Sequence, residues 1–224
     1  LPPGIDPISE EDDPQRFIGA SLITLLYMTQ IAAISHDPWF SRVGSPLHAD
    51  YVAIDLDPGE GATFATVLDV ARLVHEELSS LKVPSVPKTS GSRGLHIYIP
   101  LAPGTSYESG MLFCQIVATV IASRHPKIAT VERMVRARRK GTVYVDYLQN
   151  ILGKTLATAY SARASDYAGV STPLKWDEVL DGQLDPRDFT ITTAPARFEQ
   201  VGDLWAKLRT SKPAKLDTVF RKYK

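Results

Sequence analysis

The chain has 224 residues, of which 44% are hydrophobic and 22% are charged, so it can bury an ordinary globular core without a disulfide or a structural metal. Its 25 basic and 25 acidic side chains balance, which removes any argument from net charge for a polyanionic partner. The single cysteine, Cys114, cannot pair within the chain and no stretch is apolar for long enough to cross a membrane, so a cytoplasmic, intracellular location is expected.

The N-terminal part begins with a polar segment and continues with helical and strand patterns. Residues 1–15 are rich in proline and acid and are expected to be an N-terminal tail or a truncated connection. Pro14 introduces a helical pattern that runs to about residue 34. Residues 51–54 predict a buried strand, and residues 63–81 carry apolar side chains at the spacing of an amphipathic helix.

A pair of strands with a tight connection follows. Residues 83–88 predict an edge strand, because prolines interrupt them, and residues 95–99 predict a more regular one. Further predicted elements are a helix at residues 106–123, a short basic helix at 131–138, strands at 142–145 and 155–160, and helices at 176–180, 202–208 and 216–223. The hairpin-like pair indicates an α+β fold, with a mixed or antiparallel sheet flanked by helices.

Three aspartates stand at predicted strand ends. Because side chains alternate across a strand, Asp55 and Asp57 should project to the same face about 6–7 Å apart, where they could clamp cations. The competing interpretation is an ordinary strand end, since Asp57-Pro58-Gly59 is also a favourable turn sequence. Asp146 repeats the arrangement after another apolar strand and could equally be a turn residue. Together, three such carboxylates suit a site for two divalent metal ions.

Several other residues could contact phosphate groups. Residues 88–98 form a predicted turn whose glycines and hydroxyls could cradle phosphate oxygens, although the spacing is not that of a Walker loop. His96 lies on the less apolar face of the following strand, where a lone histidine is usually structural. Arg163 could make a bidentate phosphate contact, Lys154 could supply a point charge, and His36 is a further candidate.

Basic residues are concentrated in one stretch. Between residues 124 and 140 there are seven basic side chains against one acidic one, whereas residues 10–13 are all acidic. The basic stretch could follow a phosphate backbone. The alternative is a solvated helix face, which is the more common origin of such a pattern.

Taken together, the motifs resemble the archaeo-eukaryotic primase superfamily. They are DLDPG at residues 55–59, TSGSRGLHIYIPL at 89–101, and VDYLQN with GKT and YSAR within 145–163. Their order and spacing are most similar to the polymerase domain of ligase D-type proteins of bacteria and archaea, which act in non-homologous end joining. The similarity extends over about residues 31–208, through ISHDPW, RARRKG, STPLKWDEV and DPRDFTI.

The resemblance implies a fold and a set of site residues. Residues 16–224 would form a primase-polymerase catalytic domain with an RRM-like sheet, in one or two lobes. Asp55, Asp57 and Asp146 would bind two divalent metal ions, with manganese favoured over magnesium. The triphosphate of an incoming NTP or dNTP would be held by Ser90, His96 and Arg163, with Lys154 and His36 as further candidates, and DNA by Arg136, Arg138, Arg139 and Lys140.

The resemblance also implies a function. The chain would be a DNA-dependent nucleotidyltransferase that fills gaps and extends 3′ ends in end-joining repair, with primase activity as an extension, and with Ku and a DNA ligase as partners. The family's N-terminal lysines and aromatics, which recognise DNA ends, have no counterpart that aligns here. Two other functions stay open, a catalytically silent DNA-end-binding module and a metal-dependent phosphoesterase. The metal ligands argue against the first and the triphosphate cradle against the second.

Overall fold

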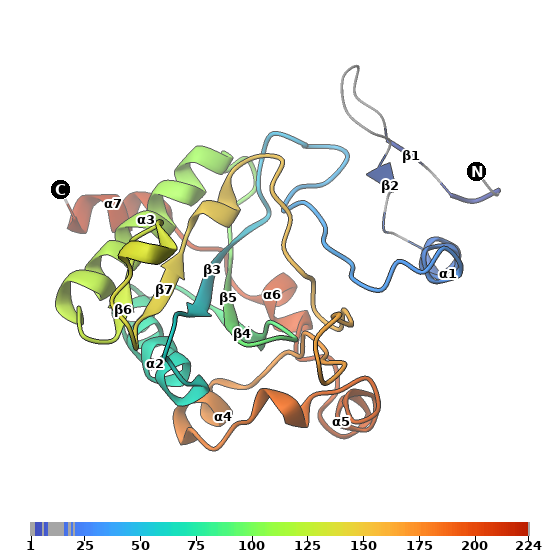
Figure 1. Ribbon diagram of the computed structural model, residues 1–224. Coiled ribbons are helices and arrows are strands. Elements are labelled where there is room, and N and C mark those ends of the chain that lie inside the picture. The colour runs from blue at the N-terminus through green and yellow to red at the C-terminus, as the bar shows by residue number, and fades with distance from the viewer. Residues whose placement is uncertain (1–2, 6, 9–15, 18, 20, 224) are drawn as a thin grey trace.

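Strand β3 (Tyr51–Pro58) lies at the centre of a five-stranded sheet with the strand order β4-β5-β3-β7-β6 (Figure 1). In the computed structural model, which describes residues 3–5, 7–8, 16–17, 19 and 21–223, the other strands are β4 (Val86–Thr89), β5 (Leu95–Pro100), β6 (Ala129–Thr130) and β7 (Val143–Asp146). Neighbouring strands pair antiparallel, except that β6 runs parallel to β7. This sheet and its flanking helices confirm the predicted α+β fold class.

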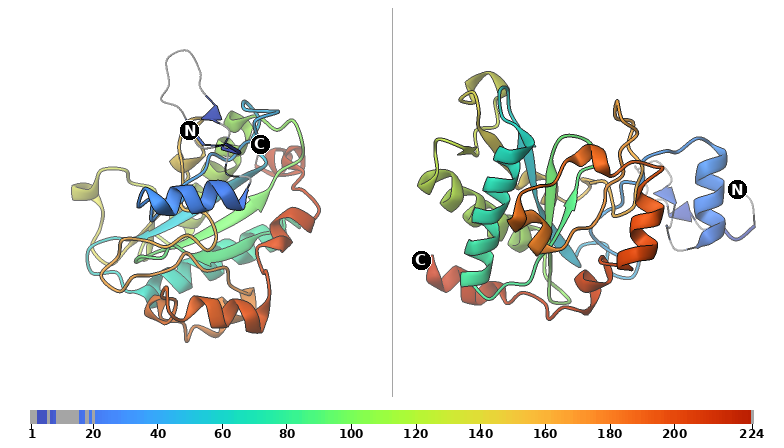
Figure 2. Two further views of the ribbon diagram at one scale, coloured as in Figure 1. Left: turned by 90° about the vertical axis from the view of Figure 1, so that its right-hand side faces the viewer. Right: turned by 90° about the horizontal axis from the view of Figure 1, so that it is seen from below.

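Two long helices, α2 (Phe64–Ser80) and α3 (Tyr107–Arg124), pack beside each other against one face of the sheet (Figures 1 and 2). Each helix begins at a hydroxyl N-cap, Thr63 or Ser106, whose side-chain oxygen accepts a hydrogen bond from the backbone N–H three residues later. Helix α3 carries the buried Cys114, as the apolar sequence around that residue predicts. These helices supply most of the apolar cover of the sheet.

Alternation along β3 divides the sheet into a core face and a polar face. Val52, Ile54 and Leu56 are fully buried members of the hydrophobic core, which continues into α2 and α3. Because neighbouring side chains on a strand point to opposite faces, Asp55 and Asp57 project away from those helices. One strand therefore anchors the core with one set of residues and presents carboxylates with the other.

The remaining elements are short. The helices are α1 (Leu22–Gln30), α4 (Trp176–Asp181), α5 (Ala194–Val201), α6 (Ala206–Thr210) and α7 (Leu216–Lys222), and the 3-10 turns are η1 (Val135–Ala137), η2 (Leu148–Asn150) and η3 (Pro186–Asp188). Strands β1 (Pro7–Ile8) and β2 (Arg16–Phe17) pair with each other near α1, away from the main sheet (Figure 1). Within the described residues, no helix has both the length and the apolar character needed to cross a membrane.

The first predicted helix is much shorter than expected. Helix α1 starts only after Ser21, whose hydroxyl accepts a hydrogen bond from the N–H of Thr24. It ends before Ala32, which has a φ of 59°, outside the range of a right-handed helix. Arg16–Phe17 is a strand instead, and the predicted start at Pro14 lies outside the described residues.

Two other predicted elements are wrong. Only η1 forms within residues 131–138, because the Arg138 guanidinium donates to the carbonyls of Glu132 and Arg133, and the Glu132 carboxylate accepts from the N–H of Met134. These side-chain bonds occupy backbone groups that a helix would use. Residues 155–160, all of them described, form no strand, and Tyr160 at their end has a φ of 64°.

Candidate active site

Four buried polar residues form one row across the polar face of the sheet. In the strand register, Lys88 of β4 stands opposite His96 of β5, His96 opposite Asp55 of β3, and Asp55 opposite Asp146 of β7. Directly opposite residues in an antiparallel sheet point to the same face with their Cβ atoms about 4.5–5.5 Å apart. The row therefore collects two carboxylates, an imidazole and an amine on the side of the sheet that α2 and α3 leave uncovered.

The two aspartates of β3 lie inside the strand and not after it, which corrects their predicted place at a strand end. The strand continues to Pro58 because its last four residues pair with β7, where Asp57 stands opposite Tyr144. Asp55 is buried and Asp57 is exposed. Asp146 is the last residue of β7, so the structure brings all three predicted aspartates to one region of the sheet.

Burial and mutual repulsion make the ionised form of Asp55 costly. Its pKa lies well above the ordinary value, first because the carboxyl is buried and then because Asp57 and Asp146 carry like charges. The positive charges of Lys88 and Arg163 oppose this shift without cancelling it. A divalent cation between the carboxylates would reverse the shift, because it would favour the charged form of each one.

Asp57 is subject to a similar shift from a different environment. Although part of its side chain is exposed, the surrounding atoms reduce the hydration of its carboxylate, and this and the charge of Asp146 raise its pKa, whereas the guanidinium groups of Arg138 and Arg93 lower it. Arg138 lies with its guanidinium carbon 3.8 Å from the centroid of the Tyr144 ring. The basic stretch therefore reaches the rim of the carboxylate cluster.

The chemistry of the carboxylates suits divalent cations that prefer oxygen ligands. Asp55 Oδ1 is buried and has no hydrogen-bond partner among the described residues, which is costly for a carboxylate oxygen unless a cation contacts it. Asp146 is oriented by bonds from the N–H of Leu148 at 2.7 Å and the Gln149 amide at 3.2 Å. No three His, Cys, Asp or Glu side chains of the described residues converge on a single ion position. Magnesium-type ions commonly take one or two carboxylates and complete their shell with substrate phosphates and water, so such a cage is not required.

His96 has a polar neighbour at each of its two ring nitrogens. Its Nδ1 is 2.8 Å from Lys88 Nζ, and its Nε2 is 3.3 Å from Asp55 Oδ1, close to but outside good hydrogen-bond geometry. Lys88 is not individually predicted from the sequence to contact a ligand, although it is the first residue of the turn predicted at residues 88–98. Its signal in the sequence is a lysine in an apolar strand, Val86-Pro87-Lys88.

The Ser90 turn is built by close backbone approach. Ser90 Oγ accepts hydrogen bonds from the N–H groups of Ser92 at 3.1 Å and Gly94 at 3.0 Å, so its hydroxyl hydrogen remains to donate to a ligand. A Cβ on Gly94 would stand 2.4 Å from the carbonyl oxygen of Leu56, so only glycine lets this turn lie against β3. The turn therefore lies against β3 beside Asp57, whose Oδ1 would stand 3.5 Å from the same Cβ.

Arg163 and the segment around His36 line a pocket next to this turn. The pocket has a volume of about 240 Å³ and is lined by Ser35, Asp37, Ser92, Arg163, Ala164 and Ser165. The N–H of His36 donates to Ser161 Oγ at 2.8 Å, which ties its segment to the one that carries Arg163, and His36 Nε2 is buried without a partner among the described residues. Lys154 lies exposed on a turn closed by the bond from its backbone N–H to the carbonyl of Ile151, and within the described chain its side chain makes no hydrogen bond or ion pair with this cluster.

The predicted DNA contacts lie on an arm, residues 131–140, that projects from the body (Figure 2). Arg136, Arg139 and Lys140 are exposed on it, and Arg138 is half-buried against Tyr144. Lys140 Nζ is 2.5 Å from Glu60 Oε1, so part of its charge is already matched. The arm thus presents cations near the carboxylate cluster.

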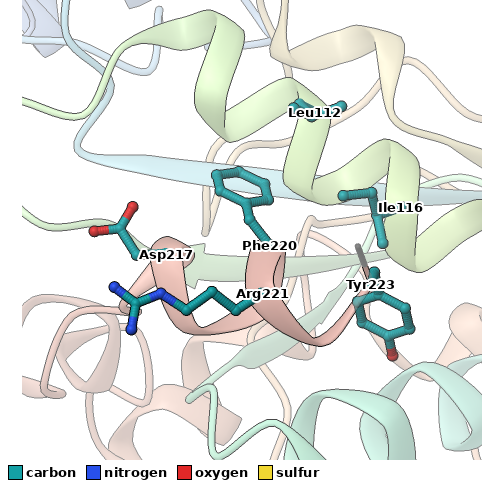
Figure 3. Close-up of a pocket in the computed structure, with 6 residues that line it drawn as sticks. All are labelled: Leu112, Ile116, Asp217, Phe220, Arg221 and Tyr223. Carbon is teal, nitrogen blue, oxygen red and sulfur yellow. The ribbon is translucent and has the colours of Figure 1, made fainter.

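A larger pocket of about 500 Å³ lies between α3 and α7, in the helix layer on the other side of the sheet (Figure 3). It is lined by Leu112, Ile116, Asp217, Phe220, Arg221 and Tyr223. Its walls are mainly apolar, and the carboxylate row is not part of them. The chemistry that the three aspartates offer therefore belongs to the polar face.

Comparison with known proteins gives concordant results. The family profile described as "LigD, primase-polymerase domain" matches residues 3–205. The chain is 35% identical over 190 residues to the bifunctional non-homologous end joining protein LigD of Bacillus subtilis, and 34% identical over 191 residues to the multifunctional LigD of Mycolicibacterium smegmatis. Each alignment covers 84% of this chain but only 30% and 25% of those proteins, so the chain spans less than a third of their length.

A solved structure shares the fold. The polymerase domain from Mycobacterium tuberculosis ligase D, determined in complex with DNA, superposes with a TM-score of 0.82 and 29% sequence identity, over 95% of this chain and 77% of that one. Together with the profile match from residue 3, this similarity reaches well before residue 31, where the motif resemblance begins. The N-terminal segment is therefore part of the similarity, although it carries none of the motifs on which the resemblance is based.

Proposed function

Because the chain belongs to the family of LigD primase-polymerase domains, we propose that it adds nucleotides to the 3′ ends of DNA in non-homologous end joining, by filling gaps and extending broken ends. The observation that carries this proposal is the meeting of Asp55, Asp57 and Asp146 on one sheet face, beside the pocket that Arg163 lines. This arrangement offers a site for metal ions next to a site for phosphates.

Each residue has a task in the proposed reaction. Asp55, Asp57 and Asp146 would hold two divalent ions, manganese or magnesium, whose chemistry is to lower the pKa of the attacking 3′-hydroxyl and to neutralise the leaving pyrophosphate. Arg163 would bind the triphosphate of the NTP or dNTP through its fork of N–H donors, Ser90 through its hydroxyl and His96 through a ring N–H. His36 and Lys154 extend the proposed nucleotide site, His36 through its buried Nε2 and Lys154 only as an exposed charge.

The DNA would approach along the basic arm. Exposed arginines attract phosphates without reading sequence, which suits an enzyme that must accept any broken end. The relative from M. tuberculosis was determined with DNA, which supports DNA as the partner of this chain. Ku and a DNA ligase are proposed as further partners and the bacterial nucleoid as the location, since the similar full-length proteins are end-joining proteins.

Replacement of one metal ligand tests the proposal. With manganese, a labelled primer–template and nucleotides, the wild-type chain should extend the primer, and Asp146→Ala should abolish extension while its circular dichroism stays native. Asp181→Ala, which removes an exposed carboxylate at the end of α4, is the matched control and should extend normally. Extension by Asp146→Ala at the wild-type rate would refute the assignment. DNA binding by a wild-type chain that extends nothing would favour the silent module, and release of phosphate from DNA ends would favour a phosphoesterase.

A further inference from the structure

Lys88 is an ionisable residue without a role in the proposed reaction, and it is completely buried. Its side chain has a relative exposure of 0% and lies on the polar face of β4. Its Nζ is 2.8 Å from His96 Nδ1, makes a short hydrogen bond to Ser171 Oγ, and lies 5.4 Å from the centroid of the Tyr98 ring. Burial of an amine is costly unless its hydrogens find acceptors, so this placement calls for a role.

The neighbouring groups determine the direction of the hydrogen bonds. The Ser171 hydroxyl donates to the carbonyl oxygen of Thr89 at 3.0 Å, so the hydroxyl oxygen is left to accept from Lys88. As an ammonium group, Nζ offers hydrogens and no lone pair, so it donates to both of its neighbours. The second acceptor is His96 Nδ1, which must then present its lone pair. The imidazole proton is consequently on Nε2, the nitrogen that faces Asp55 Oδ1 at 3.3 Å.

We propose that Lys88 is a positioning residue that fixes His96 as the Nε2–H tautomer and directs this N–H toward the metal and triphosphate site at Asp55. The inference rests on the proposed function, because it assumes that His96 contacts the nucleotide. A free imidazole in water populates both neutral tautomers, and a donor at Nδ1 selects one of them. Because Nδ1 accepts from Lys88 and so carries no hydrogen of its own, the ring is neutral while its Nε2–H donates.

The row geometry explains why a lysine is suited to this task. Lys88 and His96 are opposite residues on neighbouring strands, so their backbones are held at a constant separation by the ladder bonds of β4 and β5. Ser171 comes from a segment that runs along the outer edge of β4, where the N–H of Thr89 donates to the carbonyl of Thr172 at 2.9 Å. Nζ is thus fixed from two sides, and the imidazole has little freedom to rotate.

The tautomer can be measured without any enzymatic activity. In the full chain labelled with ¹⁵N-histidine, long-range ¹H–¹⁵N spectra should show His96 with a protonated Nε2 and an unprotonated Nδ1, and the signal should be missing from His96→Ala. Lys88→Met keeps a long unbranched side chain but removes the donor, and should leave His96 as a mixture of tautomers. Lys127→Met removes an exposed lysine and is the control. A pure Nε2–H signal in folded Lys88→Met, or an Nδ1–H signal in the wild type, would overturn the proposal.

Kinetic measurements distinguish a role of Lys88 in positioning His96 from a role in fold stability alone. In primer extension, Lys88→Met should raise the apparent KM for the nucleotide about tenfold, the effect of one lost hydrogen bond, and change kcat less. In a His96→Ala background the same replacement should have no further effect on KM, whereas additive effects would contradict the proposal. If Lys88→Met does not fold, Ser171→Ala provides the test. This variant removes the hydroxyl that accepts from Lys88 Nζ and helps to hold it in place, so His96 should again become a mixture of tautomers. A chain that extends no primer refutes the proposed function, but the spectra still decide the role of Lys88.

Discussion

The salt dependence of DNA binding tests the basic arm quantitatively. Arg136 and Arg139 are exposed, and among the described residues neither has an acidic partner within ion-pair distance, in contrast to Lys140 with Glu60. Each phosphate contact contributes about 0.9 to the slope of log K against log salt for duplex DNA. Replacement of both arginines by alanine should therefore make the slope less negative by about 1.8, if each contacts one phosphate.

Fluorescence anisotropy of a labelled recessed-end duplex, titrated between low and moderate salt, measures this slope. The matched control replaces Arg221 and Lys222 of α7 by alanine, which removes the same charge from the helix layer on the opposite side of the sheet. The control should keep the wild-type slope. Lys140→Ala should change it by less than about 0.9, because Glu60 already offsets part of that charge. Equal slopes for the wild type and the arm variant, or an equal change in the control, would refute the arm as the DNA contact.

Three further predictions concern the site. His96→Ala should raise the apparent KM for the nucleotide, and an unchanged KM in steady-state extension assays would exclude it from the nucleotide site. Gly94→Ala should destabilise the fold by roughly 1–3 kcal/mol, because its Cβ would stand 2.4 Å from Leu56 O; an unchanged Tm would contradict this. Since the pKa of Asp55 is raised by folding, its cost to the metal-free protein grows as pH rises above the unfolded value, so Asp55→Asn should raise Tm at neutral pH. Manganese should then raise Tm of the wild type more than that of Asp55→Asn, as thermal unfolding by circular dichroism can show.

Family membership and fold class could be predicted from the sequence, because both depend on local patterns. Alternation of polar and apolar residues places Asp55 and Asp57 on one face, and the matches to the family profile and to a solved polymerase domain confirm the predicted family. The same alternation separates His96 from Leu95 and Ile97, which lie in the core. A sequence pattern with a period of two predicts which face a side chain takes, because side chains alternate between the two faces of any strand.

Contacts between distant segments could not be predicted. Lys88 meets Ser171, 83 residues away, only because a segment without regular structure lies along the edge of β4. Asn150 is similar, since its side-chain amide bonds both the N–H and the carbonyl of Ala53, 97 residues away, and takes the place of a strand partner there. The prediction of a strand at residues 155–160 is wrong for the same reason. Apolar residues of this segment are buried near Tyr98 of β5, whose hydroxyl donates to the carbonyl of Ala157, but the segment does not pair with the sheet as a strand.

Strand β3 supplies core residues with one face and carboxylates with the other, and this restricts how its length can change in evolution. Loss or gain of one residue within Tyr51–Pro58 would exchange the two faces of the strand, burying carboxylates under the helices and exposing the core residues to water. Such a length change would disturb the core and the carboxylate face together, because the same strand supplies both. The arm at residues 131–140 contributes no side chain to the buried core after Val131, and length variation can accumulate there. Relatives should therefore keep the length of β3 unchanged while the length of the arm differs from one to another.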